Sequence, residues 1–151
     1  MSGFRFHLEA SLRIAEQALE AAQREFAQEV QLWKSFVEAC KVQLKHFNEA
    51  QDGQRQAGRH SAQELGIWHL FAAQQQRQLQ QCNVALGVQE PIMEQARSVL
   101  LEAHREVEKF ERLKVKQCKA FQLAELQKEQ KVLDETGQVL HWRQQSVHIN
   151  S

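Results

Sequence analysis

The sequence predicts an all-α fold, a long antiparallel two-helix coiled-coil hairpin in which the second helix overhangs the first. Six glycines and one proline among 151 residues leave few sites for turns, which argues against all-β and alternating β–α folds. The 24 glutamines, together with abundant alanine, leucine, glutamate and lysine, favour long helices with polar outer faces. Apolar residues also recur at alternating steps of three and four, which is the spacing of a coiled-coil seam.

The first run of apolar residues predicts a helix over about residues 4–50. One extra step of four, from Phe26 to Val30, is a stutter that locally unwinds a supercoil. The predicted seam of this helix contains Leu8, Leu12, Ala15, Leu19, Ala22, Phe26, Val30, Trp33, Val37, Cys40, Leu44 and Phe47.

A turn is expected at about residues 51–60, which contain Gly53 and Gly58 and no aliphatic residue larger than alanine. The next four residues, Ser61-Ala-Gln-Glu64, have the form of a capping box. In such a box the serine hydroxyl accepts from the glutamate amide, and the glutamate side chain reaches back to the serine amide. A second helix is therefore expected to begin at about residue 61.

The second helix is expected to extend to about residue 136, where Thr136-Gly137 is a plausible stop. Pro91 lies outside the seam, so a kink near it need not disrupt the packing. The tail, residues 137–151, has no clear period and stays unassigned. The second seam contains Leu65, Trp68, Ala72, Gln75, Leu79, Cys82, Leu86, Gln89, Met93, Ala96, Leu100, Ala103, Val107, Phe110, Lys114, Gln117, Phe121 and Ala124.

Folding the chain at residues 51–60 as a single domain, 1–151, pairs the two seams in reverse order. In this register Phe47 faces Leu65 and Cys40 faces Ala72, so Cys40 and Cys82 are expected in separate layers, too far apart to be bridged. The first helix ends at a layer that contains Ala103. The second helix then overhangs, and its apolar seam residues are expected to have no partner on the first helix.

This overhang is the main candidate for a binding surface, because residues 109–119 carry five basic residues and one acidic residue. One interpretation is a helix that completes its packing against another protein; the other is a solvated continuation of the helix. The candidate binding residues are Lys109, Phe110, Arg112, Lys116, Lys119 and Phe121. Near the turn, Phe71 lies off the seam and is a second candidate contact.

Composition excludes several classes of function. The 19 basic and 19 acidic residues cancel, so no net field favours nucleic acid. No apolar run is long enough to insert in a membrane, and the first residues contain no apolar segment of a secretory signal. No catalytic or phosphate-binding motif occurs, and His104 with Glu108 lacks a third metal ligand. We therefore expect no enzyme, metal or cofactor. The three cysteines, an odd number without CxxC spacing, predict reduced thiols in a cytosolic protein.

Two blocks of sequence resemble the flagellar FliJ family. Residues 4–28, FRFHLEASLRIAEQALEAAQREFAQ, are similar to the family's Phe-basic-Phe-x-Leu start with an arginine in the first seam turns. Residues 107–114, VEKFERLK, and 126–135, LQKEQKVLDE, are similar to its C-terminal "EKLKER … EQKxxDE" block. The glycine turn and the chain length also fit, so the resemblance covers nearly the whole chain.

The resemblance implies a soluble coiled-coil stalk of the flagellar type III protein export apparatus. It implies a location at the cytoplasmic face of the inner membrane, reached through the apparatus, and a role in flagellum biogenesis and motility. The implied partners are the export ATPase ring, the linker of the export-gate membrane protein, and export chaperones. Gln43, Phe47, Phe71 and Cys82 align with family contact positions near the turn, and Gln43 and Phe71 keep the residue type. Two alternatives remain, a stalk protein of a virulence type III secretion system and a general coiled-coil chaperone or scaffold.

Overall fold

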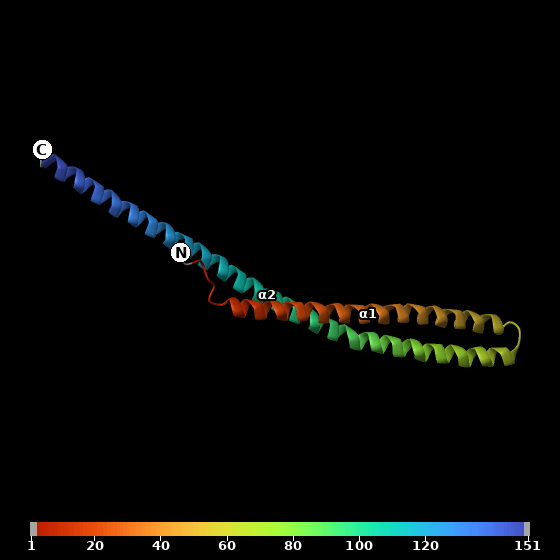
Figure 1. Ribbon diagram of the computed structural model, residues 1–151. Helices are drawn as coiled ribbons and strands as arrows, with labels where there is room; N and C mark the ends of the chain where they lie inside the picture. The colour runs from red at the N-terminus through yellow and green to blue at the C-terminus, as the bar shows by residue number, and fades with distance from the viewer. Residues whose placement is uncertain (1–2, 150–151) are drawn as a thin grey trace. The chain divides into compact units, whose positions relative to one another are not determined.

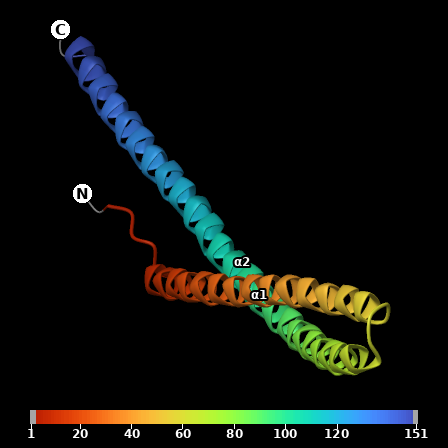
Figure 2. The same cartoon turned by 90° about the vertical axis from the view of Figure 1, so that its right-hand side faces the viewer.

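A computed structural model describes residues 3–149 of the chain as two long helices packed against each other. Helix α1 spans Glu9–Ala57 and helix α2 spans Ala62–Ile149. The structure is 93% helical, and no strand occurs in residues 3–149. Figures 1 and 2 show α1 and α2 leaving the turn side by side and antiparallel. The prediction of an all-α two-helix hairpin is confirmed.

The chain divides into two compact units. One unit contains Glu16–His104, that is, most of α1, the turn and the first part of α2. The other contains Met1–Ala15 together with Arg105–Ser151. The first unit is thus one continuous segment, whereas the second joins the two ends of the chain, and each is described by itself below.

The turn is shorter than the sequence indicates, because α1 continues through Gly53 to Ala57 instead of ending near residue 50. Only residues 58–61 separate the helices, closed by hydrogen bonds from the amides of Arg59 and His60 to the carbonyls of Gln56 and Ala57. The Ser61 hydroxyl accepts a hydrogen bond from the Glu64 amide at 3.3 Å, which is the first of the two contacts of the predicted capping box. The Ser61 amide donates to the Ala57 carbonyl at 3.1 Å.

The register between α1 and α2 in the Glu16–His104 unit is set by two buried glutamines of α2. Gln43 donates from Nε2 to the Gln75 side-chain oxygen at 2.6 Å and to the Gln75 carbonyl at 3.2 Å. Fourteen residues further along α2, Gln89 donates to the backbone carbonyl and to the carboxylate of Glu29, which lies fourteen residues before Gln43. Because polar layers in a coiled coil favour one alignment, these contacts specify the pairing.

The predicted register is wrong, because the turn lies at residues 58–61 and not at 51–60. Cys40 was expected opposite Ala72 and in a separate layer from Cys82. Instead, Cys40 lies close enough to Cys82 for the two thiols to interact. Burial raises the pKa of the Cys40 thiol, and the neighbouring Cys82 raises it further. All three cysteines are free thiols.

The predicted seam of α2 follows the observed burial closely. Every member from Ala72 to Phe121 is buried or half-buried, and Gln75 and Gln89 are among the most buried. On α1 the predicted seam residues up to Cys40 are buried or half-buried. The packed face then passes through Gln43 instead of Leu44, which is 47% exposed. The periodicity therefore identified the packed faces even where the pairing between them was wrong.

In the second unit, the N-terminal residues before α1 lie against α2. The Phe4 and Phe121 ring centroids are 5.7 Å apart, and Glu9 forms an ion pair with Lys114 at 3.0 Å. Phe6 is buried, and residues 3–8 are not helical, although the sequence predicted helix from residue 4. Phe121 was expected to have no partner on the first helix; its ring packs against Phe4, which lies before α1 begins.

Helix α2 does not stop at Thr136-Gly137 but continues to Ile149. The Thr136 hydroxyl donates to the Val132 carbonyl at 2.9 Å, and no described glycine has a positive φ. Further along, Gln145 bonds His141, and the Ser146 hydroxyl donates to the Trp142 carbonyl. The Gln145–His141 pair joins two side chains one turn apart, a spacing that supports a helix, within the segment left unassigned from the sequence. The first two and last two residues of the predicted domain lie outside the described range.

Candidate functional site

The basic residues of the predicted overhang are largely paired with acidic neighbours. Lys109 lies 3.1 Å from Glu106 and also above the Phe110 ring, 5.2 Å from its centroid. Arg112 lies 3.6 Å from Glu108. Together with the Lys114–Glu9 pair, these contacts reduce the local positive charge that the sequence indicated. Exposed pairs of this kind contribute little to stability, so Lys109 and Arg112 can exchange these partners for others at small cost.

The ammonium groups of Lys116 and Lys119 are accessible to a partner. Both are exposed, and within residues 3–149 no ion pair involves either of them. They line a shallow groove on the outer face of α2 together with Arg112, Val115 and two glutamates. Val115, which is 53% exposed, gives this face an apolar centre. The groove is therefore amphipathic, with its basic groups toward the C-terminal end of the stretch.

The two phenylalanines of this candidate surface have different surroundings. Phe110 is half-buried in the α2 seam, beneath the Lys109 ammonium. Phe121 is half-buried against Phe4, in a tilted ring pair. Neither ring is fully exposed, so a partner reaches Phe121 only where Phe4 leaves it uncovered. The sequence did not indicate this, because residue 4 was placed inside a helix.

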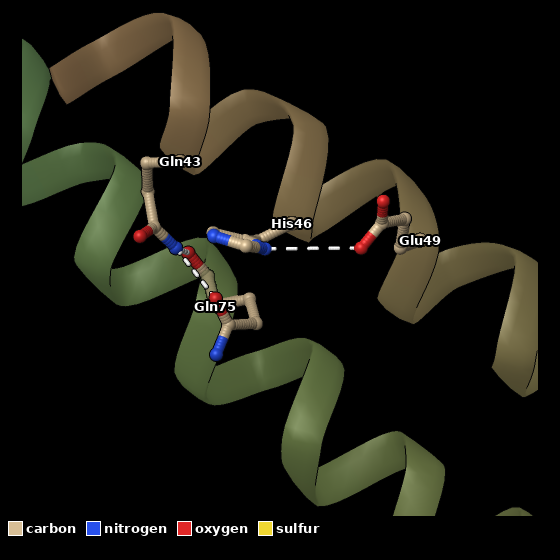
Figure 3. A network of polar contacts seen from close by, with 4 residues as sticks. All are labelled: Gln43, His46, Glu49 and Gln75. Carbon is tan, nitrogen blue, oxygen red and sulfur yellow. Dashed lines mark hydrogen bonds and ion pairs between the residues drawn. The ribbon is translucent and has the colours of Figure 1, made fainter.

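Near the turn, the Gln43 side chain forms hydrogen bonds within the hairpin. Figure 3 shows its amide directed across to Gln75, while His46 points along α1 toward Glu49, 3.7 Å away. Phe47, one turn further, is half-buried. Of the three candidate contacts near the turn, two therefore lie in or beside the packed interface between α1 and α2.

Phe71 belongs to an exposed apolar patch. Its ring is 41% exposed and packs edge-on against Trp68, with centroids 5.8 Å apart. Ile67 and Leu70, which neighbour it on α2, are about 70% exposed. Ile67 and Leu70 were not among the candidate contact residues predicted from the sequence. Their spacing could have indicated them, because residues 67, 70, 71 and 74 share one helix face that lies outside the seam.

Residues 3–149 contain neither a cluster of metal-binding side chains nor a helix that could span a membrane. Within this range, no group of three or more histidine, cysteine, aspartate or glutamate side chains is placed to hold a metal ion. No helix in the described range combines the length and the hydropathy needed to cross a bilayer.

Comparison with protein families identifies the chain. Residues 4–146 match the model of the flagellar FliJ protein family. The chain belongs to the FliJ family. No curated protein and no solved structure matches the chain significantly. The resemblance noted in the N-terminal and C-terminal blocks is thus confirmed over nearly the whole sequence.

Membership in the FliJ family makes the chain a protein related to flagellar export, with helical coiled-coil character. FliJ proteins are non-catalytic export components. The candidate sites on this chain are the surfaces that are open to other proteins. Two such surfaces are defined by the geometry, the basic groove that contains Lys116 and Lys119, and the apolar patch of Ile67, Leu70 and Phe71.

Proposed function

We propose that this FliJ-family chain is a soluble stalk of the bacterial flagellar type III export apparatus. It acts at the cytoplasmic face of the inner membrane, where it couples the export ATPase ring to the export gate and assists export chaperones. The observation that carries the proposal is the match of residues 4–146 to the flagellar family. This match also favours the flagellar system over a virulence secretion system and over a general scaffold.

The unit formed by the chain's two ends is the proposed contact with the ATPase ring. The exposed charges of Lys116 and Lys119, in a groove with Val115, support this assignment. Lys109, Phe110, Arg112 and Phe121 lie on the same stretch of α2. Complementary charge at such a contact raises the association rate and makes binding sensitive to salt.

The unit that contains the turn is the proposed contact with the gate linker or with chaperones. The patch of Ile67, Leu70 and Phe71 supports this assignment, because clustered apolar side chains on a surface are typical of protein contacts. Phe47 lies close to the interface and Gln43 bonds Gln75, so both act in this proposal mainly by holding the hairpin in register.

ATPase stimulation by the purified chain tests the ring contact. We expect the double variant Lys116→Glu/Lys119→Glu to lose most of the stimulation at low salt and to retain its helical content. The matched control is Lys41→Glu/Lys45→Glu, the same change in charge on exposed residues of α1 in the other unit. Equal stimulation by all three proteins would remove Lys116 and Lys119 from the contact.

Phe121 needs a control of its own because of its contact with Phe4. If Phe121 binds the ring directly, Phe121→Ala reduces stimulation more than Phe4→Ala does. If Phe121 acts only by holding the N-terminal residues against α2, the two variants have equal effects. Phe110→Ala completes the set, since its ring contributes to the α2 seam.

A further inference from the structure

The last part of α2 carries a second coiled-coil seam that no other segment of residues 3–149 covers. Every residue from 126 to 149 is exposed. Leu126, Leu133, Leu140 and Val147 recur at intervals of seven and are 54–68% exposed. Glu129, Thr136 and Arg143 lie between them, so the steps alternate strictly between three and four. This is the spacing of a two-stranded coiled coil.

The same helix face is widened on one side by two more exposed valines, Val132 and Val139. The opposite side carries Lys131, Gln138 and Gln145. A single helix with an apolar stripe and a polar back gains stability only when the stripe is covered. The face extends over three heptads, which is enough for a weak, reversible contact.

The charges within this seam distinguish between the ways of covering it with another copy of the same helix. In a parallel pair, Glu129 faces Glu129 of the second copy and Arg143 faces Arg143, which is repulsive in both layers. In an antiparallel pair centred near Thr136, Glu129 of each copy lies within one layer of Arg143 of the other. The leucines stay in the interface, and Val132 comes beside Val139 of the second copy. The face is thus complementary to itself under a two-fold axis.

We propose that residues 126–147 bind a second copy of this chain as an antiparallel coiled coil centred near Thr136. This inference rests on the seam and its charges, and it does not depend on the proposed stalk function. In the cell, the pairing keeps the exposed leucines away from water until another surface replaces the second copy.

Sedimentation equilibrium of the full chain over a range of concentrations at low salt tests the proposal. We expect the mass to rise from one chain to two with concentration. Arg143→Glu and Glu129→Arg, each alone, place like charges in both layers and weaken association by about tenfold or more. An equimolar mixture of these two variants restores it, because each chain then supplies the charge that the other lacks.

Lys131→Glu is the matched control, since it makes the same change in charge as Arg143→Glu on the opposite side of the helix. It leaves association unchanged. Three outcomes overturn the proposal: a single-chain mass for the natural sequence at every concentration, single variants that associate as tightly as the natural sequence, and a mixture that associates no better than its components. Circular dichroism of each variant excludes loss of helix as the cause.

Discussion

The indole ring of Trp68 on α2 lies against the backbone of Gly53 on α1, where no other residue type fits without a shift. A Cβ atom at Gly53 would lie 2.7 Å from Cη2 of Trp68 and still closer to two other ring carbons. Gly53 therefore serves as a packing site inside a helix and not as a turn residue. The neighbouring Gln54 amide bonds His69 at 3.0 Å, which fixes the same layer.

Replacing Gly53 by alanine is expected to destabilise the hairpin. Alanine is the better helix former, but its methyl group collides with the Trp68 ring, and such overpacking costs about 1–3 kcal/mol. Gly87→Ala is the matched control, because nothing lies within 4 Å of the Cβ it adds to α2. That variant should gain about 0.5–1 kcal/mol from helix propensity. Urea melts followed by circular dichroism measure both; equal stabilisation by the two would contradict the close contact.

Trp33 provides a second test of packing. Its indole N–H is buried and has no hydrogen-bond partner among the described residues. Trp33→Phe keeps most of the ring and removes the unsatisfied donor, so we expect a change in unfolding free energy within about 1 kcal/mol. Trp33→Ala, which removes the ring, should cost about 3 kcal/mol. If Trp33→Phe is as damaging as Trp33→Ala, the donor has a partner in solution.

The Cys40 thiol predicts how stability depends on pH. Because its pKa is raised above 9.0 in the folded chain, the unfolded chain loses this proton first as the pH rises. Ionisation therefore favours unfolding: this contribution to stability is complete below about pH 8 and declines through pH 9 and above. Comparing alkaline melts of the natural sequence with Cys40→Ser measures the effect. Cys118→Ser is the control and should keep the alkaline decline.

Gln43 and Leu70 separate structural roles from binding roles near the turn. Gln43→Ala leaves the buried Gln75 amide without its partner and should cost about 1–2 kcal/mol of unfolding free energy. Leu70→Ala changes a side chain that is 70% exposed and should alter stability by less than about 0.5 kcal/mol. Thermal melts compare the two. A loss of gate or chaperone binding in Leu70→Ala with unchanged melting would assign Leu70 to a contact surface.

The sequence by itself determined the two helices, the serine cap before α2 and the face that each helix buries. Periodicity carries this information, because an apolar residue at every third or fourth position can have only one face toward a partner. The α2 seam from Ala72 to Phe121 follows burial for this reason. The terminal blocks likewise indicated the FliJ family, which the match over residues 4–146 confirms. The candidate binding residues remain predictions.

Only the tertiary structure decided how the helices pair along their length. Sliding one helix by a heptad keeps every apolar face in contact, so the pattern alone cannot choose a register. The choice depends on local shape and polar partners: Trp68 needs the space at Gly53, and Gln75 needs the amide of Gln43. That register brings Cys40 to Cys82. At the other end, Phe4 contacts Phe121 from a segment, residues 3–8, that is not helical, and helical periodicity cannot reveal where such a segment packs.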